Sequence, residues 1–382
     1  MTPAARCQAA IEILNRVRAG DAAEKALTNW ARGARYAGSK DRAAVRDVVF
    51  DVLRMWRSCA AIGGGESGRA CVLGYLRQTG QDASLIFTGQ GHAPAPLSDQ
   101  EVASGDRPQG AAAWDLPDWL ADRFADSLGD KAEATALALR SRAPVFLRGN
   151  TARTDLPAAQ AALAAEGIET KPVPCVETAL RVTAGARRVA RAQAYLTGLV
   201  ELQDAASQAV VARLPLDGAA RILDYCAGGG GKALAMAART GRCITAHDAD
   251  LRRMADLPLR AARAGAEVVT TAQPSGMFDL VLCDVPCSGA GAFRRAPEGK
   301  WRLTPARLSE LCDLQADILD RAARLVGPQG VLAYVTCSVL AEENARQIRA
   351  FQVRNSGWNV LDTVQYLPGD DGDGFYLSVL KR

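Results

Sequence analysis

Histidine is nearly absent from this chain of 382 residues, which contains only His92 and His247. His92 lies in a stretch rich in glycine and proline, and His247 directly precedes Asp248 near the end of an expected strand. Neither histidine has the strand-to-helix setting of a hydrolase nucleophile elbow. A Ser-His-Asp or Cys-His hydrolase would need one of them, so the sequence argues against both classes.

Paired cysteines and long apolar runs are also missing. The 10 cysteines include no Cys-x-x-Cys pair, so we expect neither a metal site nor a secreted disulfide framework. No apolar run reaches the roughly 18 residues that a membrane span needs, and the N-terminus lacks the apolar core of a signal peptide. We therefore expect a cytoplasmic protein without membrane association, and we take it to be a monomer.

Net charge is small, +4 at pH 7, but positive charge is concentrated near the N-terminus. Residues 1–60 contain 11 Lys or Arg and 6 Asp or Glu. This asymmetry fits a polyanionic partner, although a solvated basic face explains the charge alone equally well. A second basic cluster is a candidate phosphate contact; it consists of Arg181, Arg187, Arg188 and Arg191.

The hydrophobic pattern divides the chain into four parts. Residues 1–87 are predicted to form a small helical domain, and residues 88–112, rich in glycine and proline, a linker. Residues 113–202 are predicted to form a small α+β module, and residues 203–382 a Rossmann-like α/β domain with a doubly wound sheet. In the module, strands are expected at 145–150, 172–176 and 179–183. In the α/β domain, strands are expected at 221–224, 243–247, 267–270, 278–283, 330–335 and 375–381, with a helix at 251–264.

A glycine-rich loop joins the first strand of the α/β domain to a helix. It consists of Tyr225, Cys226, Ala227, Gly228, Gly229, Gly230, Gly231 and Lys232. Successive glycines let the backbone approach a ligand closely and leave the N–H groups of the helix free. Asp248, which ends the next strand, is in position to accept a hydrogen bond from a ribose diol. We therefore predict an adenosine-containing cofactor, either S-adenosylmethionine or, because the glycines also satisfy G-x-G-x-x-A, a nicotinamide dinucleotide.

Two predicted strands each deliver a cysteine to their carboxyl ends. Residues 278–283 are followed by Asp284 and Cys287, and residues 330–335 are followed by Cys337. The carboxyl ends of strands are where open α/β sheets place ligands. This pattern indicates a nucleophilic cysteine that acts on a nucleobase.

Three segments resemble the main motifs of the Sun/Fmu (RsmB-type) RNA cytosine-5 methyltransferases. They are residues 224–232, 284–291 and 336–338. Supporting matches are QDAAS at 203–207, KWRLTP at 300–305, EEN at 342–344 and DGF at 373–375. The resemblance covers at least residues 114–382, and residues 1–60 are similar to the NusB-type helical RNA-binding domain of some members. Unlike the family, this chain has no proline in its first loop and no acid after the strand at 267–270, near Ala272.

The resemblance implies S-adenosylmethionine-dependent methylation of carbon 5 of a cytosine in RNA, through a covalent cysteine adduct at carbon 6. The implied substrate is 16S ribosomal RNA. Cys337 is implied as the attacking thiol, Cys287 as the thiol that assists release, and Asp284 as the group that holds the base.

The same resemblance implies sites for the cofactor and for RNA. Implied cofactor contacts are Cys226, Ala227, Gly228, Gly229, Gly230, Gly231, Lys232, Asp248, Arg253 and Asp284. Expected RNA contacts are Arg294, Arg295, Lys300, Arg187, Arg188 and Arg42. The alternatives are the same activity on transfer RNA, a non-catalytic RNA-binding ribosome assembly factor, and a nicotinamide oxidoreductase.

Overall fold

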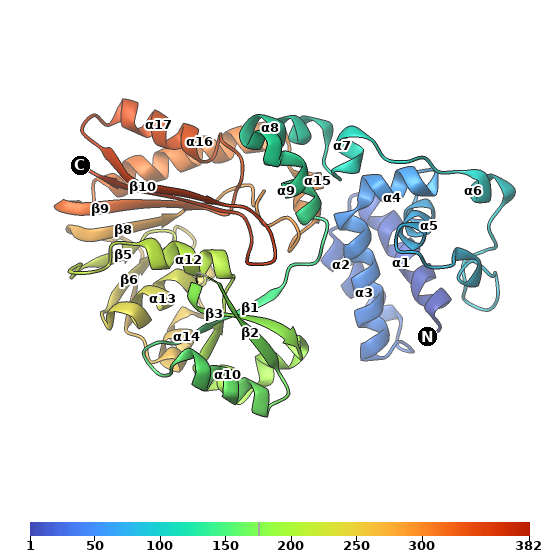
Figure 1. Ribbon diagram of the computed structural model, residues 1–382, viewed down its shortest axis with the longest axis horizontal. Helices are drawn as coiled ribbons and strands as arrows, with labels where there is room; N and C mark the ends of the chain where they lie inside the picture. The colour runs from blue at the N-terminus through green and yellow to red at the C-terminus, as the bar shows by residue number, and fades with distance from the viewer. Residues whose placement is uncertain (175) are drawn as a thin grey trace. The chain divides into compact units, whose positions relative to one another are not determined.

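The computed structural model describes residues 1–174 and 176–382. Its contacts divide the chain into two compact units (Figure 1). Unit 1 comprises residues 1–142 and 293–303, and unit 2 comprises residues 143–292 and 304–382. Residues 113–142, expected in the α+β module, lie in unit 1, as do residues 88–112, expected as a linker. The four-part division itself stays a prediction.

Unit 1 is helical. Its α-helices are α1 (Pro3–Arg18), α2 (Ala23–Gly33), α3 (Ser39–Arg54), α4 (Trp56–Gly63), α5 (Gly68–Gln78), α6 (Asp99–Ala103), α7 (Gly110–Ala113), α8 (Asp118–Leu128), α9 (Ala132–Ala138) and α15 (Glu298–Arg302). Helix α1 begins where the Thr2 side chain accepts a hydrogen bond from the amide of Ala5, a standard N-cap. One face of α1, including Cys7, Ile11 and Leu14, is buried with apolar side chains of α3 and α5. This three- and four-residue spacing is what places one helix face in a core.

Residues 293–303 belong to unit 1 although they follow the second motif in the sequence. Arg54 Nε donates to the carbonyl oxygen of Arg294 (2.8 Å), and Lys300 Nζ donates to the carbonyl oxygen of Arg54 (2.7 Å). Trp301 Nε1 donates to the carbonyl oxygen of Leu53 (2.7 Å). Helix C-termini leave carbonyl groups without intrahelical partners, and α15 supplies donors for two of those at the end of α3.

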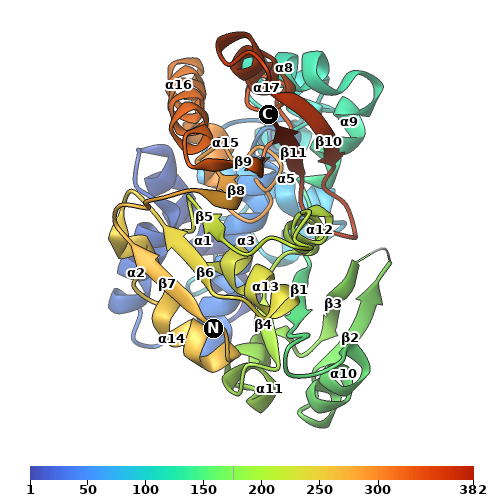
Figure 2. The same cartoon turned by 90° about the vertical axis from the view of Figure 1, so that its left-hand side faces the viewer.

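Unit 2 contains a small antiparallel sheet, β2–β3–β1–β4. Its strands are β1 (Val145–Gly149), β2 (Glu169–Val173), β3 (Val176–Ala184) and β4 (Val200–Leu202), with helices α10 (Leu156–Ala165) and α11 (Gln193–Leu196). Leu147, Leu163 and Leu180 are buried together between α10 and this sheet (Figure 2). The expected strand at 172–176 includes residue 175, which lies outside the described residues.

The rest of unit 2 is a seven-stranded sheet in the order β10–β11–β9–β8–β5–β6–β7. The strands are β5 (Ile222–Asp224), β6 (Ile244–His247), β7 (Val268–Thr271), β8 (Phe278–Asp284), β9 (Val326–Thr336), β10 (Asn359–Tyr366) and β11 (Phe375–Lys381). The helices are α12 (Ala205–Arg213), α13 (Gly231–Thr240), α14 (Leu257–Ala264), α16 (Pro305–Ala323) and α17 (Ala345–Arg354). Strands β5 to β9 run parallel to one another, and β11 is antiparallel to both β9 and β10. The last strand, β11, has the bounds expected at 375–381.

Alternate residues of the central strands face two different helix layers. Leu280 and Leu282 are buried with Met236 of α13 on one face, whereas Val281 is buried with Leu319 of α16 on the other. Successive side chains of a strand point to opposite faces, so a strand covered on both faces is apolar throughout. Figure 1 shows α16 and α17 along one side of the strands and α12 and α13 along the other.

The sheet order brings the functional motifs to one edge. Strands β6, β5, β8 and β9 are neighbours, and their carboxyl ends lead to Asp248, the glycine loop, Asp284 and Cys337. Asp284 pairs in register with Val335, so the segments after β8 and β9 leave the sheet side by side. No helix among the described residues is long and apolar enough to cross a membrane.

Candidate active site

The two motif cysteines lie together at the carboxyl ends of β8 and β9. The Sγ atoms of Cys287 and Cys337 are 3.3 Å apart, within hydrogen-bond distance. The hydrogen bond with Cys337 raises the pKa of Cys287 well above its ordinary value, and burial and the charges of Cys337 and Glu343 act in the same direction. Two thiolates side by side are therefore disfavoured.

A buried ion pair lies beside the thiols. Lys232 Nζ is 2.6 Å from Asp284 Oδ2, and the lysine side chain is 7% exposed while that of Asp284 is 33% exposed. Burial alone would lower the pKa of Lys232, but the charges of Asp284, Asp224 and Cys337 outweigh it and the pKa is raised. Lys232 is therefore a fixed cation, and partly exposed Asp284 remains accessible to a ligand.

The glycine loop has a backbone that few other residues could adopt. Gly228 and Gly230 have φ of +52° and +78°, in the left-handed region that favours glycine. A Cβ at Gly230 would overlap the side chain of Leu257. The carboxylate of Asp248 accepts hydrogen bonds from the amides of Gly228 and Asp250, each at 2.9 Å. Asp248 therefore holds the loop open as well as occupying the position expected for a ribose contact.

Asp224, at the end of β5, is an unpartnered buried carboxylate. It is 1% exposed, and both of its oxygen atoms lack a hydrogen-bond partner among the described residues. Burial, followed by the charge of Asp284, raises the pKa of Asp224 to about 7. A buried polar group without a partner calls for a ligand or another explanation. The sequence motif contains Asp224, but nothing in the pattern alone marked it as a site residue.

Two further polar residues of the site, Glu343 and Asn344, were not predicted from the sequence. Both are buried, and both bond to residues next to the thiols. They were noticed only as part of a motif. Their distance along the chain from Cys287 hides this contact, and only the fold reveals it.

The expected basic RNA contacts divide into exposed and buried residues. Arg42, Arg187, Arg188, Arg295 and the cofactor-side Arg253 are exposed, and Arg253 pairs with Asp248 at 3.1 Å. In contrast, Arg294 and Lys300 are only 2% and 1% exposed within unit 1. Burial also lowers the pKa of Lys300 to about 7. This corrects the expectation for Arg294 and Lys300, because neither side chain is open to an approaching phosphate.

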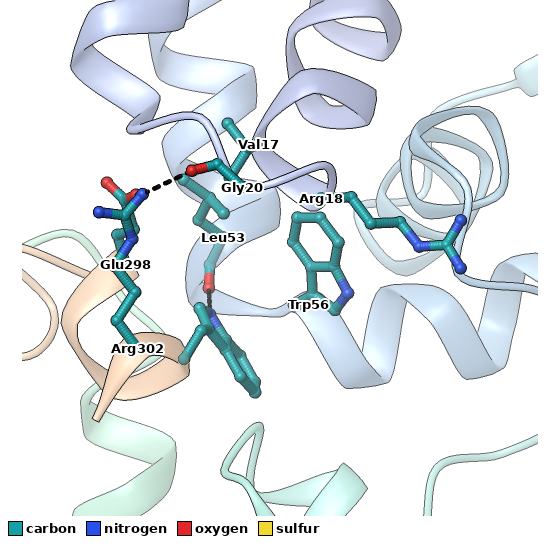
Figure 3. Close-up of a pocket in the computed structure, with 8 residues that line it drawn as sticks. Val17, Arg18, Gly20, Leu53, Trp56, Glu298 and Arg302 are labelled. Carbon is teal, nitrogen blue, oxygen red and sulfur yellow. Dashed lines mark hydrogen bonds and ion pairs between the residues drawn. The ribbon is translucent and has the colours of Figure 1, made fainter. Parts of the chain in front are cut away.

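A separate cavity of about 450 Å³ lies within unit 1. It is lined by Val17, Arg18, Gly20, Leu53, Trp56, Glu298, Trp301 and Arg302 (Figure 3). Arg302 pairs with Glu298 at 2.6 Å and donates to the carbonyl oxygen of Gly20 at 3.4 Å. The cavity thus combines aromatic surface with arginine side chains. The described residues contain no group of three or more His, Cys, Asp or Glu placed to hold a metal ion.

Comparison with known proteins gives two family matches, which together cover most of the chain after residue 115. The family model described as 16S rRNA methyltransferase RsmB/F matches residues 211–381, and that of the RsmF/B-like ferredoxin-like domain matches residues 116–189. The ribosomal RNA small subunit methyltransferase B of Xylella fastidiosa is 36% identical over 293 residues, covering 71% of this chain and 67% of the relative. The protein of the same name from Xanthomonas campestris is 32% identical over 357 residues, covering 87% and 78%.

Solved structures give the same fold. A methyltransferase homologue from Pyrococcus horikoshii matches with a TM-score of 0.63 at 23% identity, covering 72% of this chain and 97% of that one. A structure of NSun6 from the same organism, solved with SFG, matches with a TM-score of 0.61 at 16% identity, covering 69% of this chain and 98% of that one. Together the comparisons confirm the expected Rossmann-like methyltransferase fold and S-adenosylmethionine as the cofactor. The nicotinamide alternative is therefore not retained.

Proposed function

Because this chain belongs to the RsmB/F family of methyltransferases, we propose that it methylates carbon 5 of a cytosine in 16S ribosomal RNA. The observation that carries the proposal is the pair of thiols, 3.3 Å apart, next to the Lys232–Asp284 ion pair. The relatives' names supply the substrate class, and the thiol pair supplies the chemistry at carbon 5.

The cofactor site fits S-adenosylmethionine, which supplies an electrophilic methyl group when bound. The glycine loop admits a ligand close to its backbone, and Asp248 suits the ribose hydroxyls. Asp224 offers two unpartnered acceptor oxygens, which suit the amino group of the methionine part. Arg253 is held beside this site by its ion pair with Asp248.

Carbon 5 of cytosine is a weak nucleophile, and covalent catalysis removes that difficulty. The thiolate of Cys337 adds to carbon 6, which places electron density on carbon 5 and on the N3 side of the ring. A carboxylate oxygen of Asp284 accepts a hydrogen bond from the exocyclic amine and so orients the base, while the ammonium group of Lys232 beside it offsets the negative charge that develops on the ring. The charge of Cys337 acts on the pKa of Lys232, so the fixed positive charge lies close to the attacking sulfur.

Release reverses the addition. After carbon 5 has gained the methyl group, its proton passes to water, the electron pair of that bond forms the carbon 5–carbon 6 double bond again, and the bond from carbon 6 to the Cys337 sulfur breaks with its electron pair on sulfur. Cys287 lies within hydrogen-bond distance of that sulfur and assists this step. Loss of Cys287 should therefore trap the adduct, whereas loss of Cys337 should prevent it.

RNA contacts are proposed at exposed basic residues and at the cavity of unit 1. Arg42, Arg187, Arg188 and Arg295 remain candidates for phosphate contacts. The cavity of unit 1 adds Trp56, because aromatic rings stack on unpaired bases and arginines follow the backbone in single-stranded RNA recognition.

The test uses tritiated methyl donor with unmodified 16S ribosomal RNA and, in parallel, unmodified transfer RNA. Wild-type protein should label cytosine in 16S RNA, Cys337→Ala should be inactive, and Cys287→Ala should accumulate a denaturant-stable protein–RNA adduct. Label in transfer RNA alone would contradict the substrate. Tight RNA binding without label in either RNA would favour the assembly-factor alternative, and a trapped adduct in Cys337→Ala would reverse the thiol roles.

A further inference from the structure

Two adjacent residues in the turn before α17 bind the two segments that carry the thiols. Glu343 binds the segment of Cys287, and Asn344 binds the segment of Cys337. The carboxylate of Glu343 accepts hydrogen bonds from the amide and the hydroxyl of Ser288, at 2.7 and 2.5 Å. Ser288 directly follows Cys287. The side chain of Glu343 is fully buried, so these bonds are not exchanged with water, and breaking them would leave a buried carboxylate unsatisfied.

Asn344 bonds in the same way to the other thiol segment. Its Oδ1 accepts from Thr336 Oγ1 at 2.6 Å, and its Nδ2 donates to the carbonyl oxygen of Ser338 at 3.0 Å. Thr336 and Ser338 are the two neighbours of Cys337. Asn344 is 2% exposed. One side chain therefore bonds to the residues on both sides of the attacking thiol.

Gln315 of α16 adds a further hydrogen bond to the segment of Cys287. Its Nε2 donates to the carbonyl oxygen of Pro286 at 2.9 Å and to Glu343 Oε1 at 3.0 Å. The hydroxyl of Tyr334 donates to the carbonyl oxygen of Glu343 at 2.6 Å and lies 3.2 Å from Gln315 Oε1. The segment of Cys287 is thus held from both sides, by Gln315 before it and by Glu343 after it. A buried hydrogen-bonded network of this kind specifies one arrangement.

We propose that Glu343 and Asn344 are positioning residues that together set the separation of the two sulfur atoms. Because they are consecutive in the chain, the segment of Cys287 and that of Cys337 are fixed to one short piece of backbone. Both side chains are buried, so neither is open to a ligand. The roles given to the two thiols rest on the proposed function, whereas the positioning of their two segments rests on the hydrogen bonds alone.

Glu343 and Asn344 also differ in charge, and this difference affects the two thiols unequally. Glu343 places a carboxylate on the Cys287 side, whereas Asn344 is neutral on the Cys337 side. Negative charge next to a thiol disfavours its thiolate, and Glu343 acts on Cys287 in this direction, after the hydrogen bond with Cys337 and burial. The arrangement keeps the proton on Cys287 and leaves Cys337 as the attacking group.

Phenylarsine oxide, a trivalent arsenical that binds two close thiols together, tests the separation without any RNA. Wild-type protein should bind one equivalent more than Cys287→Ser. Asn344→Ala and Glu343→Ala should weaken this binding at least tenfold, whereas Glu343→Gln, which keeps an acceptor for the Ser288 amide, should retain it. Asn355→Ala, which removes hydrogen bonds to Asp320 and Phe351 at the end of α17, is the matched control. Unchanged binding in a folded Asn344→Ala would overturn the proposal.

The pH dependence of alkylation tests the charge. In a Cys337→Ser background, iodoacetamide labelling of Cys287 is followed by peptide mass spectrometry, with and without Glu343→Gln. Loss of the carboxylate should move the profile to lower pH by about one unit, since a charge at short range shifts a pKa by about 1–3 units. Glu310→Gln on the exposed side of α16 should leave it in place. A merely structural Glu343 would not move the profile, and an unmoved profile would overturn the charge argument.

Single turnovers with RNA separate the two positions. Asn344→Ala should slow adduct formation about 100-fold, as expected for a misplaced reacting group, with little change in KM. Glu343→Ala should let the adduct form and slow its release. If the wild type labels no RNA, the proposed function fails. The arsenical and alkylation results still test whether Glu343 and Asn344 position the two thiols. Equal slowing of both steps in both variants would contradict the division of roles.

Discussion

Replacing the buried carboxylate of Asp224 by an amide should stabilise the protein at high pH. The pKa of Asp224 is about 7, against an ordinary 3.8. Between these values the folded protein binds the proton and the unfolded chain does not, so the free energy of unfolding falls as pH rises. At 1.36 kcal/mol per unit, the shift corresponds to about 4 kcal/mol of stability that is present below pH 4 and lost above pH 7.

The measurement is urea unfolding of wild-type protein and Asp224→Asn at pH 5 and pH 8. An amide has the shape of the carboxyl group and no charge. The free energy of unfolding of the variant, relative to that of the wild type, should therefore rise by about 2.5 kcal/mol from pH 5 to pH 8. Asp317→Asn, on the exposed side of α16, should gain nothing and controls for net charge. Added S-adenosylhomocysteine should reduce the wild-type loss, because its amino group gives the carboxylate a partner. A difference between variant and wild type that is the same at both pH values would refute the reasoning.

Three further predictions use other parts of the chain. Gly230→Ala should abolish S-adenosylhomocysteine binding measured by calorimetry, because its φ of +78° and the side chain of Leu257 leave no room for a Cβ; retained affinity would contradict the loop geometry. Burial lowers the pKa of Lys300 to about 7, so between pH 7 and pH 10 the unfolded chain binds a proton that the folded protein does not, and the free energy of unfolding of the wild type rises. Lys300→Met should remove this rise. The same change in the free energy of unfolding with pH in both proteins would contradict the argument. Trp56→Leu should weaken binding of single-stranded RNA about tenfold, as loss of one stacked base implies, whereas Trp119→Leu outside the cavity should not; equal losses in a filter-binding assay would refute the assignment.

Sequence pattern predicted the central sheet well because its strands are covered on both faces. The strand expected at 278–283 corresponds to β8, Phe278–Asp284, and the last strand agrees residue for residue. The helix expected at 251–264 is instead a short 3₁₀ turn followed by α14, which begins at Leu257 with a proline in its first turn. Pro258 has no amide hydrogen and cannot lie inside a helix, so this break could have been predicted. Strand β10 was not predicted because it is an edge strand with no fully buried side chain, and its hydrophobic pattern is weak.

The site shows why motifs give the reactive groups and not their arrangement. Two cysteines at the ends of parallel strands can be predicted to meet, because β8 and β9 are neighbours and Asp284 pairs with Val335. Strand register places backbones, but each thiol lies beyond the last strand residue, where the ladder no longer fixes it. The 3.3 Å separation therefore depends on the side chains that hold those segments. Glu343 and Asn344 do so from a turn that sequence spacing does not connect to Cys287, and this contact follows only from folding the chain.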